Sequence, residues 1–204
     1  MIRQMTFRLV PSFVLVGALG TSAASARTSA VPGWGLPARE QAVPSVTQGA
    51  IHAEVRDSSV DALPDVRIPV APDLVLAVVD VGSTDVVFRF RFRPGSFDPS
   101  STRLAIDLDT DQNAASGTAG VEYHLFVFPA GGRGADVART IGTTYTVVGT
   151  VPVSYVADGC DVSIPRGLLG DDDGRFDFRV RVFSQQALPA VLDLLPDVGF
   201  VRVQ

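Results

Sequence analysis

Hydrophobic and polar residues alternate with a period of two along most of the chain after residue 48. In "VVFRFRFRP" (86–94) phenylalanines occupy every second position, and arginines stand between them. The stretch "RFDFRVRVF" (175–183) repeats this design with phenylalanine and valine on one face. One hydrophobic and one polar face are typical of a half-buried antiparallel strand. Aromatic and β-branched residues suit such a surface, so both stretches are predicted to be strands.

The same alternation predicts further strands, separated by segments rich in glycine, proline and aspartate. These strands cover approximately 50–56, 74–82, 102–109, 121–128, 144–150, 151–157, 160–165 and 199–203. Only "PRGLLG" (165–170) indicates a helical turn, which would begin at Pro165 and end at Gly170. About ten short strands at this spacing favour an all-β fold. We expect a two-sheet antiparallel β-sandwich, either a jelly roll or immunoglobulin-like, over residues 48–204.

The first 26 residues have the pattern of a secretory signal peptide. Arg3 and Arg8 precede an apolar run, and Ala24-Ser25-Ala26 supplies small residues for cleavage. The run is shorter than the roughly 20 residues that a membrane-spanning helix needs, and no later stretch is long enough. An N-terminal core helix is the alternative. Residues 27–47 are rich in proline, glycine and serine and predict a flexible leader, so we expect a periplasmic or secreted protein.

Charge and cysteine content exclude several kinds of protein. The net charge is −5, and all 17 cationic side chains are arginine. Because the arginines alternate with other residues instead of clustering, a nucleic-acid surface is not expected. Cys160 is the only cysteine, so no internal disulfide can form. Asp158 and Asp161 would raise its pKa, which favours a small buried hydrophobic residue over a reactive thiol.

The stretch "AIDLDTDQNAASGTAGVEYHL" is the strongest candidate for chemistry. Its alternate positions hold four oxygen-bearing side chains, namely Asp107, Asp109, Asp111 and Asn113. On an extended strand, neighbouring carboxylates of this set would lie about 6.6 Å apart, so binding one ion requires the chain to turn. Turn-forming residues follow at once, and Glu122 on the next strand would complete an oxygen site suited to Ca²⁺. A solvated polar turn and a catalytic carboxylate pair are the alternatives.

This stretch is not an EF-hand. Counted from Asp107, the sixth position is Gln112 where the EF-hand needs glycine. The twelfth is Thr118 where a bidentate glutamate belongs, and no helical pattern flanks the loop. A calcium loop between two strands remains.

The segment "AIDLDTDQNAASGTAGVEYHLFVF" is similar to the DxDxDxN and GxEY segments of secreted bacterial β-sandwich modules. These modules are related in style to DOMON-like and family 9 carbohydrate-binding modules and occur attached to extracellular peptidases. The resemblance extends over 50–204 and includes "VRDSSVDALPDVRIPVAPDLVLAVV" and "LDLLPDVGFVRV". It implies a β-sandwich with a structural ion held by residues among Asp107, Asp109, Asp111, Asn113 and Glu122. Ala114-Ala115 departs from the pattern, because relatives commonly carry a proline there.

Residues for catalysis are few. His52 and His124 are the only histidines, and no GxSxG turn is present. One cysteine and two distant histidines do not make a zinc site. His124 is expected to share a strand face with Glu122, where it would support the acidic loop or lie exposed. The cluster "GDDDG" (170–174) is expected to be a polar turn or a second cation site.

The sequence therefore favours an exported, non-catalytic β-sandwich module with a calcium loop that binds a ligand, a carbohydrate or an envelope partner. A secreted hydrolase that uses loop carboxylates and a purely structural envelope protein are the alternatives. Carbohydrate binding needs aromatic platforms, and most phenylalanines are predicted to face the core. The remaining aromatic residues are Trp34, Tyr123, Tyr145 and Tyr155. A tyrosine on an outward strand face would favour sugar binding.

Overall fold

A computed structural model of the chain describes residues 45–47, 50–58, 61–170 and 173–204. The chain divides into two units, Met1–Pro37 and Ala38–Gln204, and all described residues belong to the second. The expected signal peptide, Trp34 and most of the expected leader lie outside the described residues. In the described part of the chain, no helix is long and apolar enough to cross a membrane.

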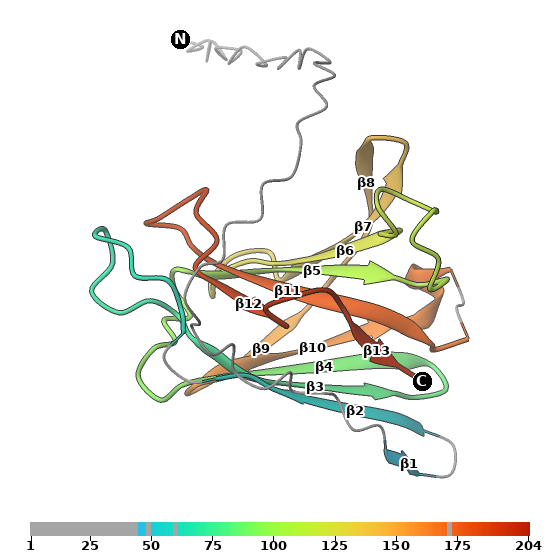
Figure 1. The fold of residues 1–204 in the computed structure, drawn as a ribbon, viewed down its shortest axis with the longest axis horizontal. Helices are drawn as coiled ribbons and strands as arrows, with labels where there is room; N and C mark the ends of the chain where they lie inside the picture. The colour runs from blue at the N-terminus through green and yellow to red at the C-terminus, as the bar shows by residue number, and fades with distance from the viewer. Residues whose placement is uncertain (1–44, 48–49, 59–60, 171–172) are drawn as a thin grey trace, which may run out of the picture. The chain divides into compact units, whose positions relative to one another are not determined.

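The second unit is a β-sandwich of two antiparallel sheets packed together, which confirms the predicted fold class (Figure 1). In spatial order, the smaller sheet contains β1 (Ser45–Thr47), β2 (Ala50–Arg56), β3 (Leu74–Val81), β4 (Asp85–Phe92), β10 (Gly159–Pro165) and β9 (Val153–Val156). The larger sheet contains β12 (Asp193–Leu195), β11 (Phe176–Ser184), β5 (Thr102–Asp109), β6 (Tyr123–Val127), β7 (Ala135–Ile141) and β8 (Thr144–Val151). β13 (Val201–Val203) also pairs with β11, beyond the end of β12.

Aromatic side chains from β4 and β11 join the two sheets. The Phe88 ring lies 6.0 Å from that of Phe176 and 5.9 Å from that of Phe178, measured between centroids. All three side chains are fully buried, as the alternation in "VVFRFRFRP" and "RFDFRVRVF" predicts. Aromatic side chains bury more apolar surface than any others, so this cluster supplies much of the cohesion between the sheets.

Three strands were not predicted from the sequence. β1 occupies the last three residues of the expected leader and pairs with β2. β7 shows no alternation, because its residues Ala135 to Ala138 are all buried. β12 is only three residues long and ends beside Pro196. The predicted helical turn is present as a 3-10 helix, Arg166–Leu169, which ends at Gly170 with a positive φ of 80°.

The outward arginines of the smaller sheet are paired across strands. Arg91 contacts Asp161 at 2.6 Å, and Arg93 contacts Asp73 at 2.6 Å. Arg89 forms a close ion pair with Asp80. Each of these arginines has an acidic partner, so this face carries little unmatched positive charge.

Candidate functional site

The acidic loop between β5 and β6 brings together three of the five predicted ligands. Carboxylate oxygens of Asp109, Asp111 and Glu122 all lie within 4.8 Å of one another. The loop folds back because Gly117 and Gly120 adopt positive φ values of 52° and 82°, which glycine adopts without strain. A β-carbon at Gly117 would lie 2.2 Å from a backbone oxygen, so only glycine fits there.

Hydrogen bonds within the loop hold these carboxylates in place. Asp111 Oδ1 accepts from the Asn113 amide and from the Ser116 hydroxyl, each at 2.9 Å. Glu122 Oε2 accepts from the Thr110 amide at 2.9 Å. Burial and then the charge of Glu122 raise the pKa of Asp109. Carboxylates that repel one another at this spacing would be stabilised by a cation such as Ca²⁺.

Two predicted ligands do not join this group. The Asn113 side-chain oxygen accepts from the Ala115 amide at 3.1 Å, within the turn itself. Asp107 lies in β5, where its side chain is 3% exposed and points to a different set of partners. The alternation that placed Asp107 and Asp109 on one face was right, but the chain turns only after Asp109.

Asp107 is bound by two guanidinium groups and a histidine. Arg179 Nη2 donates to its Oδ2 and Arg181 Nη2 donates to its Oδ1, each at 2.7 Å. His124 Nδ1 lies 3.0 Å from Oδ1, so His124 contacts Asp107 and not the acidic loop. Burial acts to raise the pKa of Asp107, but hydrogen bonds from His124, Arg179 and Arg181 outweigh it and lower the pKa to about 2.

A second acidic group joins the loop after β2 to the segments around β12. Carboxylate oxygens of Asp61, Asp73 and Asp193 lie within 4.8 Å of one another, and Asp57, Asp61 and Asp197 form an overlapping group. Both carboxylate oxygens of Asp61 are buried and accept no hydrogen bond from the described residues. Burial raises the pKa of Asp193 to about 7. The sequence signal was weak, because Asp193 and Asp197 are more than a hundred positions from the other three aspartates and meet them only in the folded chain.

The outer face of the larger sheet carries a cleft with a volume of about 390 Å³. Its walls come from β5, β6, β7, β8 and β11 and from the loops that follow β6 and β11. Its lining includes the arginine and aromatic side chains of Arg103, Phe126, Phe128, Arg133, Tyr145 and Arg181. An adjoining hollow, of about 230 Å³, shares Tyr145 and Arg181 and reaches Asp107, His124 and Arg179.

Tyr145 presents an aromatic ring to this cleft. It is 57% exposed, and its ring centroid lies 5.2 Å from that of Phe126. The other two tyrosines do not offer a platform. Tyr123 is buried in the core. Tyr155 packs against the core and donates its hydroxyl hydrogen to the Phe128 carbonyl.

Arginines surround the aromatic residues of the cleft. The guanidinium carbons of Arg103 and Arg133 lie over the Phe128 ring, 4.9 and 4.5 Å from its centroid. Arg133 also forms a close ion pair with the buried Asp136. Stacking on a ring fixes the orientation of a guanidinium group and leaves its N–H groups pointing outward from its edge.

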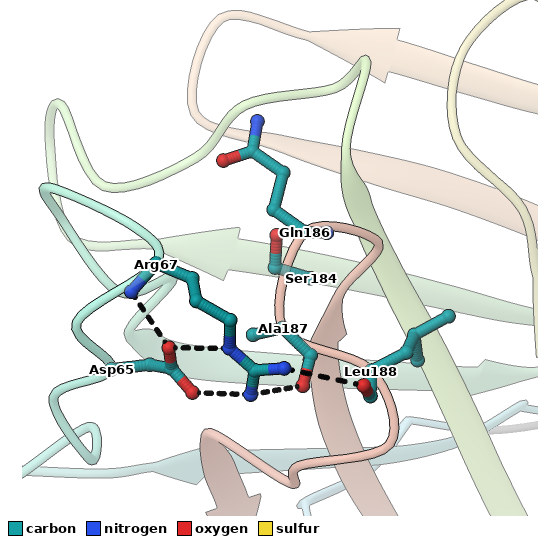
Figure 2. Close-up of polar contacts among 6 residues, drawn as sticks. All are labelled: Asp65, Arg67, Ser184, Gln186, Ala187 and Leu188. Atoms are coloured by element: carbon teal, nitrogen blue, oxygen red, sulfur yellow. Dashed lines mark hydrogen bonds and ion pairs between the residues drawn. The ribbon is translucent and has the colours of Figure 1, made fainter.

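A network centred on Arg67 holds one rim of the cleft (Figure 2). Leu188, in the loop after β11, lines the cleft, and its carbonyl oxygen accepts from Arg67 Nη1 at 3.4 Å. Arg67 Nη2 donates to the Ala187 carbonyl at 2.8 Å. Asp65 anchors the same guanidinium with contacts of 2.6 and 2.8 Å. The side chain of Leu188 points away from Arg67 in Figure 2, so the network holds the loop by its backbone.

The remaining candidates have simpler surroundings. Cys160 is buried, as expected, and burial followed by the charge of Asp161 raises its pKa to about 12. His52 Nδ1 lies 2.6 Å from Asp80. Part of the "GDDDG" cluster, residues 171–172, lies outside the described residues.

No protein-family model matches the sequence, and neither a curated protein nor a solved structure matches it. The resemblance to DOMON-like and family 9 carbohydrate-binding modules therefore stays a prediction.

Proposed function

We propose that this chain is an exported, non-catalytic β-sandwich module that binds a saccharide in the cleft on the outer face of its larger sheet. The observation that carries this proposal is the exposed ring of Tyr145 beside Phe126. An outward tyrosine on a strand was the sequence feature that would favour sugar binding. The C–H groups on one face of a sugar ring form an apolar surface, and this surface packs against an aromatic side chain.

The shape of the cleft supports this proposal. Its volume of about 390 Å³ falls in the range of small-molecule sites, roughly 300 to 1,000 Å³. Most of its wall consists of paired strands, which hold side chains in a fixed arrangement before a ligand arrives. A preformed site loses little conformational entropy on binding.

The surroundings of His124 argue against a hydrolase. Three side chains here have the order of a catalytic triad, namely the carboxylate of Asp107, the imidazole of His124 and the hydroxyl of Thr140. His124 Nε2 lies 3.4 Å from Thr140 Oγ1. In a catalytic triad, however, the carboxylate must stabilise a protonated imidazole. The Asp107 carboxylate already balances two guanidinium groups, so little negative charge is left for that role.

The proposal is tested by titrating the protein against a panel of neutral and acidic oligosaccharides by calorimetry. Tyr145→Ala should weaken binding roughly tenfold, because aromatic stacking contributes about 0.5 to 1.5 kcal/mol beyond the area that it buries. Val148→Ala is the matched control, since Val148 lies on the same strand, is 42% exposed and does not line the cleft. Saccharide binding that Tyr145→Ala leaves unchanged would place the site elsewhere. Failure of every saccharide to bind would favour a structural envelope protein, and turnover of a hydrolase substrate panel would favour an enzyme.

Calcium binding is a second candidate function, favoured by the two acidic groups. The Asp109, Asp111 and Glu122 group offers the oxygen ligands that Ca²⁺ prefers. In the second group, Asp61 has two buried carboxylate oxygens with no donor among the described residues. We propose that Ca²⁺ at these groups stabilises an exported fold that has no disulfide.

Thermal melting with calcium and with a chelator tests this candidate. A ligand that binds only the folded state raises the melting temperature as its concentration rises above its dissociation constant. Asp111→Asn should reduce the shift from the acidic loop, and Asp61→Asn should reduce the shift from the second group. Asp85→Asn is the control, because Asp85 belongs to neither group. An identical melting temperature in millimolar calcium and in chelator would rule calcium out at both.

A further inference from the structure

We infer that the cleft selects a saccharide that carries carboxylate groups, such as a uronate oligosaccharide, over its neutral counterpart. This inference rests on the proposed saccharide site and names its substrate class. It is carried by the charge around the cleft and by the way each arginine there is held.

The cleft and the adjoining hollow are positively charged on a negatively charged protein. Four arginines line them, namely Arg103, Arg133, Arg179 and Arg181, against two aspartates, Asp107 and Asp136. Four positive and two negative charges leave an excess of +2, whereas the whole chain carries −5. A concave surface of one sign attracts a ligand of the opposite sign and raises its association rate.

Of these four arginines, Arg103 is the one whose charge neither aspartate balances. Arg133 is paired with Asp136, and Arg179 and Arg181 share Asp107. Arg103 forms no ion pair within 4.0 Å among the described residues, and it stacks over Phe128. On the smaller sheet, by contrast, the two outward arginines of β4 and Arg93, which follows β4, each have an acidic partner. An arginine held by stacking presents its N–H edge for the two parallel hydrogen bonds that a carboxylate accepts.

Two further donors near the cleft have no acceptor. The Nε atoms of Arg179 and Arg181 are buried and make no hydrogen bond to the described residues. Both side chains line the hollow beside Tyr145. Buried donors are normally satisfied, and a ligand oxygen reaches these two only after the arginine side chains shift. A uronate supplies hydroxyl and carboxylate oxygens together with a ring face for Tyr145.

The experiment compares oligogalacturonate with its methyl ester by calorimetry, using the intact protein. The two ligands have the same sugar rings and differ in charge. We expect the acid to bind roughly ten- to a hundredfold more tightly, since hydrogen bonds between charged groups are the stronger kind. The preference should fall as salt rises, because ions screen the arginines.

Arg103→Gln should remove most of the preference for the acid, because the ester has no carboxylate for this guanidinium group to bind. Arg56→Gln is the matched control, because Arg56 is an exposed arginine on the smaller sheet that pairs with Glu54. Equal binding of acid and ester to the unaltered protein would overturn the inference and leave the saccharide site standing. Failure of both ligands and of all neutral saccharides to bind would overturn the inference and the proposed function together. The comparison on the unaltered protein decides the question even if Arg103→Gln does not fold.

Discussion

Asp107 lies directly opposite Arg179 in the pairing of β5 with β11, and Arg179 Nη2 donates a 2.7 Å hydrogen bond to Asp107 Oδ2. The next strand places His124 opposite Asp107 on its other side. One buried carboxylate thus links three strands across the outer face of the larger sheet. Removing it would leave two guanidinium groups facing each other without a counter-charge.

Asp107→Asn should lower the free energy of unfolding by about 2 to 3 kcal/mol, because Arg179 and Arg181, each about one-third exposed, would lose their charged hydrogen-bond acceptor. Urea denaturation measures the change. Glu54→Gln is the control, because its partner Arg56 is exposed and such surface pairs contribute about 1 kcal/mol or less. The folded pKa of Asp107 is lowered from 3.8 to about 2, so its contribution is full above 3.8 and is lost as pH falls toward 2. The two proteins should therefore differ less at the lower end of this window.

Asp193 predicts a pH dependence of the opposite sign. Burial raises its folded pKa from 3.8 to about 7. Its contribution to stability is therefore full below 3.8 and is lost as pH rises through about 7, by at most about 4 kcal/mol. In chelator, the free energy of unfolding should decline across this window, and Asp193→Asn should flatten the decline. A slope that is the same in both proteins would show that Asp193 does not cause it.

Phe88→Ala should be among the most destabilising substitutions, at about 3 to 5 kcal/mol. Phe88 is fully buried and contacts Phe176 and Phe178 of the opposite sheet, so truncation leaves a cavity between the sheets. Tyr145→Ala serves as the comparison, because an exposed ring fills no cavity and its loss should change stability by about 0.5 kcal/mol or less. Chemical denaturation of the two variants gives the contrast. Equal losses would mean that the sheets repack around the gap.

Arg67→Gln should loosen the loop after β11 without unfolding the sandwich. The guanidinium group links Asp65 to the carbonyl oxygens of Ala187 and Leu188. Amide hydrogen exchange should become faster at residues 185–192 and stay unchanged in β5. Arg56→Gln removes a comparable surface arginine and should change neither. Unaltered exchange in the loop would mean that its other contacts, such as the Leu63 amide to Leu192 carbonyl bond of 2.6 Å, are sufficient.

The fold was largely predictable because a strand with one buried face alternates in sequence. The predicted strands at 50–56 and 102–109 have the same bounds as β2 and β5. β7 was missed because residues such as Asp136 and Ala138, which alternation would place outside, are buried. Hydrophobic–polar alternation arises when one face of a strand is buried and the other is exposed, so it cannot reveal a strand with two buried faces.

The candidate sites were predictable only where they are local. The acidic loop is local, because Asp109, Asp111 and Glu122 lie close together in sequence. The residues between them include glycine and asparagine, which favour turns. Asp61 and Asp193 meet only through the pairing of distant strands, so spacing gave no signal. The ion pairs of Asp107 likewise follow from the order of strands, which alternation does not specify.

Cys160 lies on β10, the penultimate strand of the smaller sheet, between β4 and β9, and is the only thiol in the chain. Because the thiolate is the reactive form and burial raises its pKa to about 12, reagents near neutral pH should barely modify the folded protein. Any modification must then await the separation of β10 from its neighbours. The native chain thus carries its own reporter of unfolding, one that counts openings of the smaller sheet without an added label or an engineered residue.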